Sequence, residues 1–414
     1  MKPRALGFRF ALTLSLAGLC TATAVLGQTP PPRPGPPPPP PPPRNTGPAP
    51  GQPGGPLLGL TTAQLDAFRD GARIFRQVET IDSGLGPIFN ETSCVVCHNA
   101  PVPGGASRRT ITRFGLTSNG HFDPLTERGG SMLQARAIDP AFREVIPRSA
   151  NTVARRVSTP LFGAGLIEAI PDATLLAAAA APKADGVRGR AALITDVTTG
   201  KQRVGRFGWK AQQATLLAFS ADAFVNELGI TNRFFPKENA PNGDLALLAR
   251  ADPILDPEDQ ITPATGKSDV DRAADFMRAL APPARGPSSP AVIQGERLFT
   301  SLNCIVCHTP ALMTGSGPVP ALSLQRVPLY SDLLLHDMGA LGDGIAQGPA
   351  GPRDLRTAPL WGLGSRPVYL HDGRTESLDT AVREHAGEAA PARTRYVQLP
   401  TAQQQQLLSF LRSL

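Results

Sequence analysis

The chain has 414 residues and a formal net charge of +7 at pH 7, with 45 prolines, 41 glycines and five cysteines. Five Lys or Arg residues and no acidic residue precede position 57, so removing them from +7 leaves +2 for the remainder. So small a charge excludes the basic surface of a nucleic-acid-binding protein. Beyond residue 27 no apolar run is long enough to predict a transmembrane helix.

Residues 1–27 have the pattern of an export signal. Basic residues precede an apolar run at 11–19, which is too short to span a bilayer, and small residues before Gln28 favour cleavage. We therefore expect an exported, periplasmic protein. Residues 28–56 form a Pro-rich linker that favours polyproline II, and it acts either as a spacer or as a disordered lead.

The folded part is predicted to begin with an amphipathic helix. Thr61 and Gln64 have the spacing of a capping box, and Phe68 and Phe75 share the apolar face that follows. Gly71, in the pattern G-x-x-x-F, would let another helix or a cofactor edge approach closely.

The motif C-x-x-C-H follows this helix and occurs again in the second half. Such a motif attaches a c-type haem through two thioether bonds, and its His supplies a proximal iron ligand. A zinc site would need the distant Cys pairs to meet, and a thioredoxin-like dithiol would need a βαβ surround that is absent. The sequence therefore predicts two covalently bound haems, held by Cys94, Cys97, His98, Cys304, Cys307 and His308.

The chain reads as a degenerate repeat. The second half opens with Pro290 after Ser289, repeats G-x-x-x-F at 295–299, and ends with a helix for which Thr401 and Gln404 predict a capping box. Both halves close on F-x-R-x-L, near residues 280 and 414. Helix, haem motif and helix is the plan of a small cytochrome c domain, whose core the haem completes. We expect a mainly α fold with long irregular loops and few strands, divided into cytochrome c-like haem domains at 57–284 and 285–414.

Longer segments carry a family resemblance. They are R-T-A-P-L-W-G-L-G at 356–364, Y-L-H-D-G-R at 369–374, G-L-G-P-I-F-N at 84–90 and L-F-G-A-G-L-I-E-A-I-P at 161–171. Together they resemble the di-haem oxidoreductase family of peroxidase-like enzymes, also labelled thiol oxidoreductases, which is distantly related to bacterial di-haem cytochrome c peroxidase. The thiol label fits poorly, because both Cys pairs should be consumed as thioethers.

The resemblance implies that His385 is the distal ligand of the C-terminal haem. The local pattern agrees, because Leu378, Val382 and His385 share one helical face, and Gly387 would end that helix. The alternatives are a His⁺ favoured by the helix C-terminus, or Met338 as the ligand.

The N-terminal haem has no evident distal ligand, which suits peroxide or dioxygen binding. Glu168, in an otherwise apolar run, is the candidate proton shuttle; it would otherwise point outward or pair with Arg155 or Arg156. Trp209 either bridges the haems or only packs against them. Of the remaining histidines, His371 is expected to hydrogen-bond within its turn, His336 to lie at a haem edge near a propionate, and His121 to lie on the surface.

These features predict an exported di-haem c-type oxidoreductase of peroxidase type. By the resemblance, peroxide reacts at the N-terminal haem, and the C-terminal haem relays electrons from a small donor protein such as a cytochrome c or cupredoxin. The alternatives are dioxygen insertion into an organic substrate, as in the rubber oxygenases, and a purely electron-transferring cytochrome.

Overall fold

The computed structural model describes residues 48–252 and 254–414. Residues 46–414 form one compact unit, which is mainly helical with small sheets, as the sequence predicts. The signal segment and most of the Pro-rich linker lie outside the described residues. Within the described ranges, no helix is both long and apolar enough to cross a membrane.

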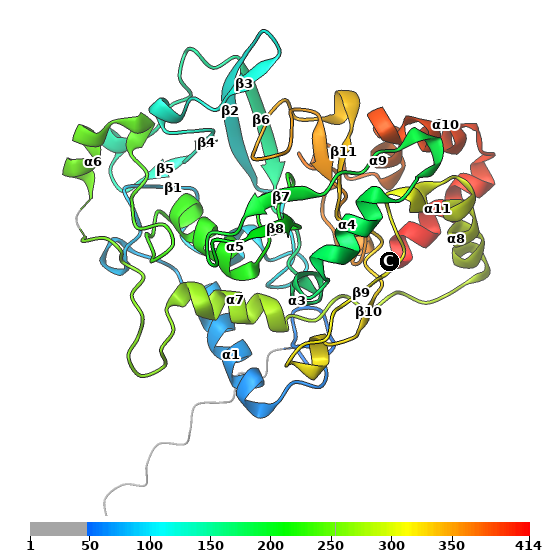
Figure 1. Cartoon of the computed structure of the whole chain (residues 1–414), viewed down its shortest axis with the longest axis horizontal. Helices are drawn as coiled ribbons and strands as arrows, with labels where there is room; N and C mark the ends of the chain where they lie inside the picture. The colour runs from blue at the N-terminus through cyan, green and yellow to red at the C-terminus, as the bar shows by residue number, and fades with distance from the viewer. Residues whose placement is uncertain (1–47, 253) are drawn as a thin grey trace, which may run out of the picture. The chain divides into compact units, whose positions relative to one another are not determined.

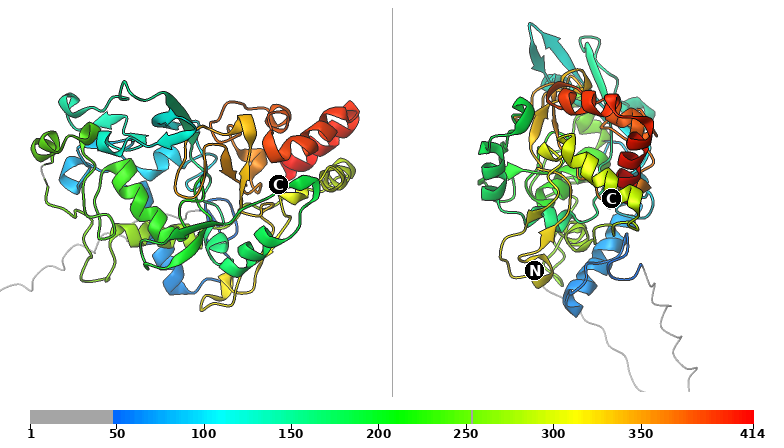
Figure 2. Two further views of the ribbon diagram at one scale, coloured as in Figure 1. Left: turned by 45° about the horizontal axis from the view of Figure 1, so that its top comes forward. Right: turned by 90° about the vertical axis from the view of Figure 1, so that its right-hand side faces the viewer.

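Two crossed helix pairs organise this unit (Figure 1). Helix α1 (Thr62–Arg76) packs on α7 (Asp269–Ala279), and α8 (Pro290–Ser301) packs on α11 (Thr401–Ser413). The views in Figure 2 also keep α8 beside α11. The members of each pair come from the beginning and the end of one half of the repeat.

The glycine of each G-x-x-x-F motif makes these crossings close. A Cβ added at Gly71 would lie 2.1 Å from the carbonyl oxygen of Arg272, and one at Gly295 would lie 2.1 Å from that of Gln406. No side chain larger than that of glycine fits at such a distance. The predicted close approach of a second helix is therefore confirmed in both halves.

Equivalent loops of the two halves, at 160–163 and 359–362, make equivalent backbone hydrogen bonds. The N–H of Gly163 donates to the carbonyl of Leu280 at 3.1 Å, and that of Gly362 donates to the carbonyl of Leu414 at 2.7 Å. Each glycine thus ties its P-L-x-G loop to the end of the F-x-R-x-L helix in its own half.

Helix starts agree with the sequence except at the last helix. The capping box of Thr61 and Gln64 forms, and Ser289 caps α8 ahead of Pro290. The capping box predicted for Thr401 was wrong: Pro400 occupies the cap position, so Thr401 is already helical. The remaining helices are α2 (Cys94–Cys97), α3 (Ala164–Glu168), α4 (Asp172–Ala180), α5 (Leu216–Ala223), α6 (Leu245–Ala251), α9 (Leu378–Arg383) and α10 (Ala390–Gln398).

The largest sheet was not foreseen from the sequence. It is antiparallel and is built on β2 (Thr110–Ser118), which pairs with β3 (His121–Asp123), β4 (Met132–Leu133) and β6 (Thr152–Val157). The other strands form four two-stranded ladders: β1 (Ile88–Phe89) with β5 (Arg136–Ala137), β7 (Ala192–Thr195) with β8 (Gln202–Gly205), β9 (Leu312–Met313) with β10 (Arg326–Val327), and β11 (Leu335–Asp337) with β12 (Asp354–Arg356).

The register of the large sheet places three residues of later interest on one face. Arg113 is opposite Met132 and Ala154, while Arg156 is opposite Ile111, two residues before Arg113. Because opposed residues and residues two apart share a face, Arg113, Met132 and Arg156 all lie on one face of the sheet.

The two halves of the repeat interlock. The backbone of Arg190 exchanges hydrogen bonds of 2.8 and 2.9 Å with Leu335 at the start of β11. The ammonium of Lys183 pairs with buried Asp332 at 3.1 Å. Segments from the first half therefore complete the surroundings of the second C-x-x-C-H motif.

Candidate haem sites

The second C-x-x-C-H motif faces a second imidazole. The His308 Nδ1 lies 3.0 Å from the carbonyl of Tyr330, and the His385 Nδ1 lies 2.8 Å from that of Ala381. When Nδ1–H donates to a carbonyl, Nε2 keeps its lone pair for a metal. The centres of the two rings are 6.5 Å apart. Since imidazole nitrogen binds such metals at about 2.0 Å, two axial imidazoles on one iron should have ring centres roughly 6 Å apart.

Both rings are held in the neutral form that metal ligation requires. Burial lowers the pKa of His308 to about 4 and also lowers that of His385. His385 lies two residues beyond the end of α9, which stops at Arg383, so the predicted helix is shorter than the sequence suggested. The hydrogen bond to Ala381, in the last turn of α9, fixes the ring nevertheless.

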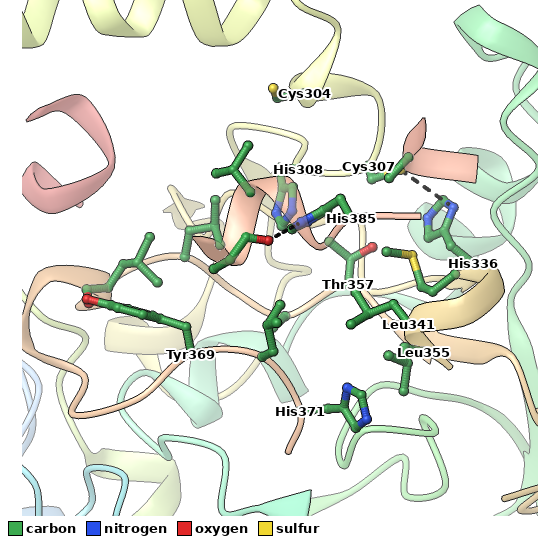
Figure 3. A pocket seen from close by; sticks show the side chains of 18 of the residues that line it. Cys304, Cys307, His308, His336, Leu341, Leu355, Thr357, Tyr369, His371 and His385 are labelled. Atoms are coloured by element: carbon green, nitrogen blue, oxygen red, sulfur yellow. Dashed lines mark hydrogen bonds between the residues drawn. The ribbon is translucent and has the colours of Figure 1, made fainter. Parts of the chain in front are cut away.

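A cavity of about 210 Å³ surrounds these imidazoles. Figure 3 shows Cys304 and Cys307 on one side of the cavity, His308 and His385 at its centre, and Tyr369 and His371 on the other side. Most of the wall is apolar, including Leu341, Leu355, Leu360, Leu378, Val382 and Leu411. Two thiols, two opposed lone pairs and an apolar cavity fit a c-type haem, which would be held by Cys304, Cys307, His308 and His385.

The first motif repeats the proximal half of this arrangement. The His98 Nδ1 lies 3.2 Å from the carbonyl of Gly105, and burial lowers the pKa of His98 to about 4. The Phe75 ring lies 6.1 Å from His98, just as Phe299 lies 6.2 Å from His308. The phenylalanine of each G-x-x-x-F motif thus packs on the proximal His of its own half.

Charged groups surround the first motif. The charge of Glu227 is one cause, after burial, of the raised pKa of the Cys97 thiol, about 12. Burial also raises the pKa values of Asp222 and Glu227, while the charge of Arg113 opposes both shifts. Burial lowers the pKa of Arg113 to about 10. The residues Arg113, Asp222 and Glu227 are called the acid–arginine cluster below.

Glu227 is held in one orientation. The Nδ2 of Asn90 donates to its Oε2 at 2.8 Å, and its backbone carbonyl accepts from the N–H of Asn90, also at 2.8 Å. Glu227 lies in a π-helical turn at 224–228, an irregularity often found at functional sites. Met132 lies beside it, since Asn90 Nδ2 is also 3.5 Å from the Met132 sulfur.

Comparison with known proteins decides the family. The family model described as "Di-haem oxidoreductase, putative peroxidase" matches residues 146–414, more than half of the chain. The chain belongs to this di-haem oxidoreductase family. No curated protein matches it in sequence.

Solved structures resemble the di-haem oxidoreductase over most of its length. Hydrazine synthase from Kuenenia stuttgartiensis is 12% identical with a TM-score of 0.40, covering 84% of this chain and 87% of its own. A MauG-like protein associated with microbial copper homeostasis is 15% identical with a TM-score of 0.40, covering 88% and 92%. A variant of the diheme peroxidase BthA from Burkholderia thailandensis is 13% identical with a TM-score of 0.37, covering 86% and 87%.

Glu168 of this di-haem oxidoreductase is engaged in structural contacts. Its Oε2 accepts from Arg278 Nε at 2.7 Å, and its Oε1 accepts from the N–H of Leu216, the first residue of α5, at 2.6 Å. Both oxygens therefore have partners, and the cation is neither Arg155 nor Arg156. The acid–base role predicted for Glu168 remains a prediction, and Glu227 competes for it.

Trp209 lies beside two cavities. It lines the cavity of about 210 Å³ and also a smaller one of about 30 Å³ beside Leu161 and Phe219. Its Nε1–H donates to the carbonyl of Val157 at 2.8 Å. The indole is thus fixed between two cavities, and its role in electron transfer stays a prediction.

His371 is buried against this indole. The two rings are 6.2 Å apart and nearly perpendicular, and burial lowers the pKa of His371 to about 4. Its Nδ1 is buried and has no hydrogen-bond partner among the described residues. The side-chain hydrogen bond predicted within its turn was therefore wrong, and only its backbone carbonyl binds, to the N–H of Val157.

His336 is bound by two carboxylates. Its Nε2 lies 3.0 Å from Asp332 and its Nδ1 lies 2.8 Å from Glu388. Burial alone would lower its pKa, but these carboxylates and the nearby Cys307 raise it to about 12. The ring is a buried imidazolium with both nitrogens engaged, so the predicted propionate contact has no free donor there.

Met338 lines the cavity, and His121 is exposed, as expected.

Sequence reasoning missed the acid–arginine cluster. Arg113 lies in an ordinary alternating strand, and Glu227 lies in an F-V-N-E-L segment typical of a helix surface. Only the fold brings them together, through contacts between residues about 137 positions apart, such as Asn90 with Glu227.

Proposed function

We propose that this di-haem oxidoreductase is an exported, periplasmic peroxidase that reduces hydrogen peroxide with electrons from a small donor protein. Cys94, Cys97 and His98 would hold the N-terminal haem, at which peroxide would react. His308 and His385 would ligate the C-terminal haem, through which electrons would be relayed. The overall change is H₂O₂ + 2 e⁻ + 2 H⁺ → 2 H₂O, in which the O–O bond breaks and the donor is oxidised. Haem iron, when bound, supplies the electron exchange with peroxide.

One observation carries this proposal, the contrast between the two motifs. His308 faces His385 at 6.5 Å, whereas the other motif has the acid–arginine cluster nearby. The remaining histidines are committed elsewhere: His121 is exposed, His336 is bound by carboxylates, and His371 lines the cavity of about 210 Å³ around His308 and His385. A doubly ligated site suits electron relay, and a site flanked by an acid and a cation suits chemistry on peroxide.

The acid–arginine cluster supplies what O–O cleavage needs from the protein. A leaving hydroxide requires a proton, and a carboxyl group with a raised pKa retains one nearer to neutral pH. The Oε2 of Glu227 accepts from Asn90, so Oε1 is the oxygen that would carry the proton. The fixed positive charge of Arg113 would stabilise the negative charge that develops on the departing oxygen. Trp209, between the two cavities, is the proposed path between the haems.

Rapid mixing tests the assignment. The reduced protein is mixed separately with hydrogen peroxide and with dioxygen, and absorbance is followed. We expect fast reoxidation by peroxide, slow reoxidation by dioxygen, and cyanide binding at one haem only. Faster reaction with dioxygen would favour the oxygenase alternative, and no reaction with any of the three would favour an electron-transfer cytochrome. Loss of a low-spin signal in Met132→Ala would identify a distal ligand at the first haem and contradict the proposal.

A further inference from the structure

Two arginines line the large cavity, and neither has an acidic partner in the part of the chain that the structure describes. Arg356, 4% exposed, donates from Nε to the carbonyl of Gly208 at 2.7 Å and from Nη1 to that of Thr357 at 3.1 Å. Arg366 donates to the carbonyls of Pro359 and Trp361, and its Nε is buried without a partner in the described chain. No ion pair involves either guanidinium within the described ranges.

The acids around this cavity are already neutralised. Asp185 pairs with Arg395, Glu388 pairs with His336, and Asp332 pairs with both Lys183 and His336. Burial lowers the pKa values of Arg356 and Arg366 to about 10, which leaves both guanidinium groups charged at neutral pH. Burying such charges with backbone carbonyls as partners is unfavourable, so an anion bound in the cavity would stabilise both guanidinium groups.

The position of the arginines indicates which anion. Figure 3 shows the attachment residues Cys304 and Cys307 at one end of the cavity and Leu355 and Tyr369 toward the other. Arg356 directly follows Leu355, and Arg366 lies three residues before Tyr369. A haem joined to two cysteines through its vinyl edge directs its two carboxylates away from that edge.

We propose that Arg356 and Arg366 bind the carboxylates of the C-terminal haem. The planar guanidinium matches a carboxylate with two parallel N–H donors, and such charge-assisted bonds are stronger than neutral ones. The cofactor is then held at three places: thioethers at one edge, imidazoles at the iron and guanidinium groups at the other edge. This inference rests on the proposed haem attachment at Cys304, Cys307 and His308.

Arg366→Gln is the informative variant, because Arg356 also holds the backbone of Gly208. Arg353→Gln is the matched control: Arg353 is 68% exposed in its side chain, and its one ion pair among the described residues is with Asp337 at 2.5 Å. The readouts are covalent haem content and the midpoint potential of the low-spin haem, neither of which requires turnover. Arg366→Lys keeps the charge and should restore most of the potential.

Loss of the guanidinium leaves a carboxylate uncompensated and favours ferric iron. Over roughly 10 Å at an effective dielectric constant of about 20, one unit charge changes such an equilibrium about tenfold, which is about 59 mV for a one-electron couple. We therefore expect Arg366→Gln to have a potential lower by about this amount, and Arg353→Gln to match the wild type. Equal potentials in the two variants would overturn the proposal.

A free carboxylate is the competing ligand, and acetate tests for it. If acetate shifts the wild-type potential, and Arg366→Gln abolishes that shift without changing the acetate-free potential, the arginines bind a free carboxylate and the proposal fails. A wild-type protein without covalent haem would instead refute the proposed function, so the two failures are distinguishable.

Discussion

Replacing Glu227 by Gln is the most informative test of the proposed chemistry. The substitution keeps the size of the side chain and its acceptor for Asn90, which donates to Oε2 at 2.8 Å. It removes the only proton that the group could transfer. If Glu227 is the acid for O–O cleavage, peroxide turnover should fall about a hundredfold. Two decades in rate correspond to about 2.7 kcal/mol of activation free energy.

The same Glu227→Gln substitution should not lower the stability of the folded protein. Burial raises the folded-state pKa of Glu227 above its ordinary value of 4.5. A carboxyl whose pKa is raised on folding favours the folded state below the unfolded pKa, and this contribution is lost as pH rises through the folded pKa. At pH 7 a neutral Gln should therefore leave the free energy of unfolding unchanged or increase it.

Glu168→Gln is the matched control, and we expect it to lower stability while leaving turnover nearly unchanged. The variant breaks the ion pair between Glu168 and Arg278, whose side chains are 18% and 32% exposed, respectively. Solvent screening limits the cost to about 1 kcal/mol. Turnover should stay close to that of the wild type.

Three measurements distinguish the two carboxylates: peroxide turnover with a reduced donor, thermal unfolding at pH 7 and the absorbance spectra of both haems. The reasoning is refuted if Glu168→Gln loses turnover at unchanged stability while Glu227→Gln retains both. That outcome would return the acid–base role to Glu168.

Three further outcomes follow from the structure. A pyridine haemochrome assay should give two haems per chain that acid–acetone does not extract; a yield of one would contradict the doubled motif. His385→Ala should convert one low-spin haem to high-spin, and added imidazole should reverse the change; an unaltered low-spin EPR signal would shift the assignment to Met338. Lys210→Met should cost about 3–5 kcal/mol in denaturant unfolding, because the fully buried ammonium pairs with Asp343 at 2.9 Å; an unchanged free energy of unfolding would contradict this reasoning.

Local patterns predicted the parts of the fold that depend on neighbouring residues. The capping box at Thr61, the N-terminus at Pro290 and the close helix contacts at Gly71 and Gly295 each follow from a few consecutive residues. The attachment motifs are equally local. The family resemblance and the local pattern both pointed to His385, whose ring lies 6.5 Å from that of His308. The helix that was to carry it ends earlier, and its role as an iron ligand stays a prediction.

Distant contacts account for what the sequence left open. Glu168 has a carboxylate in an apolar run, which suggested a shuttle, but its partner Arg278 is 110 residues away. Glu227 looked like a surface residue because nothing nearby in sequence buries it. Its burial depends on Asn90 and on a sheet assembled from strands between 110 and 157. Side-chain pairing at such separations is decided by the fold, and no short motif reports it.

The interlock between the halves has a consequence for protein engineering. The second motif resembles a self-contained cytochrome c cassette, yet Lys183 neutralises its buried Asp332 and Arg190 extends its strand β11. A graft of residues 285–414 onto another carrier would leave Asp332 with fewer counter-charges and an open strand edge exposed to solvent, which invites aggregation. Chimaeras between family members should therefore transplant the C-terminal site together with the first-half residues that complete it, Val157, Lys183 and Arg190 among them.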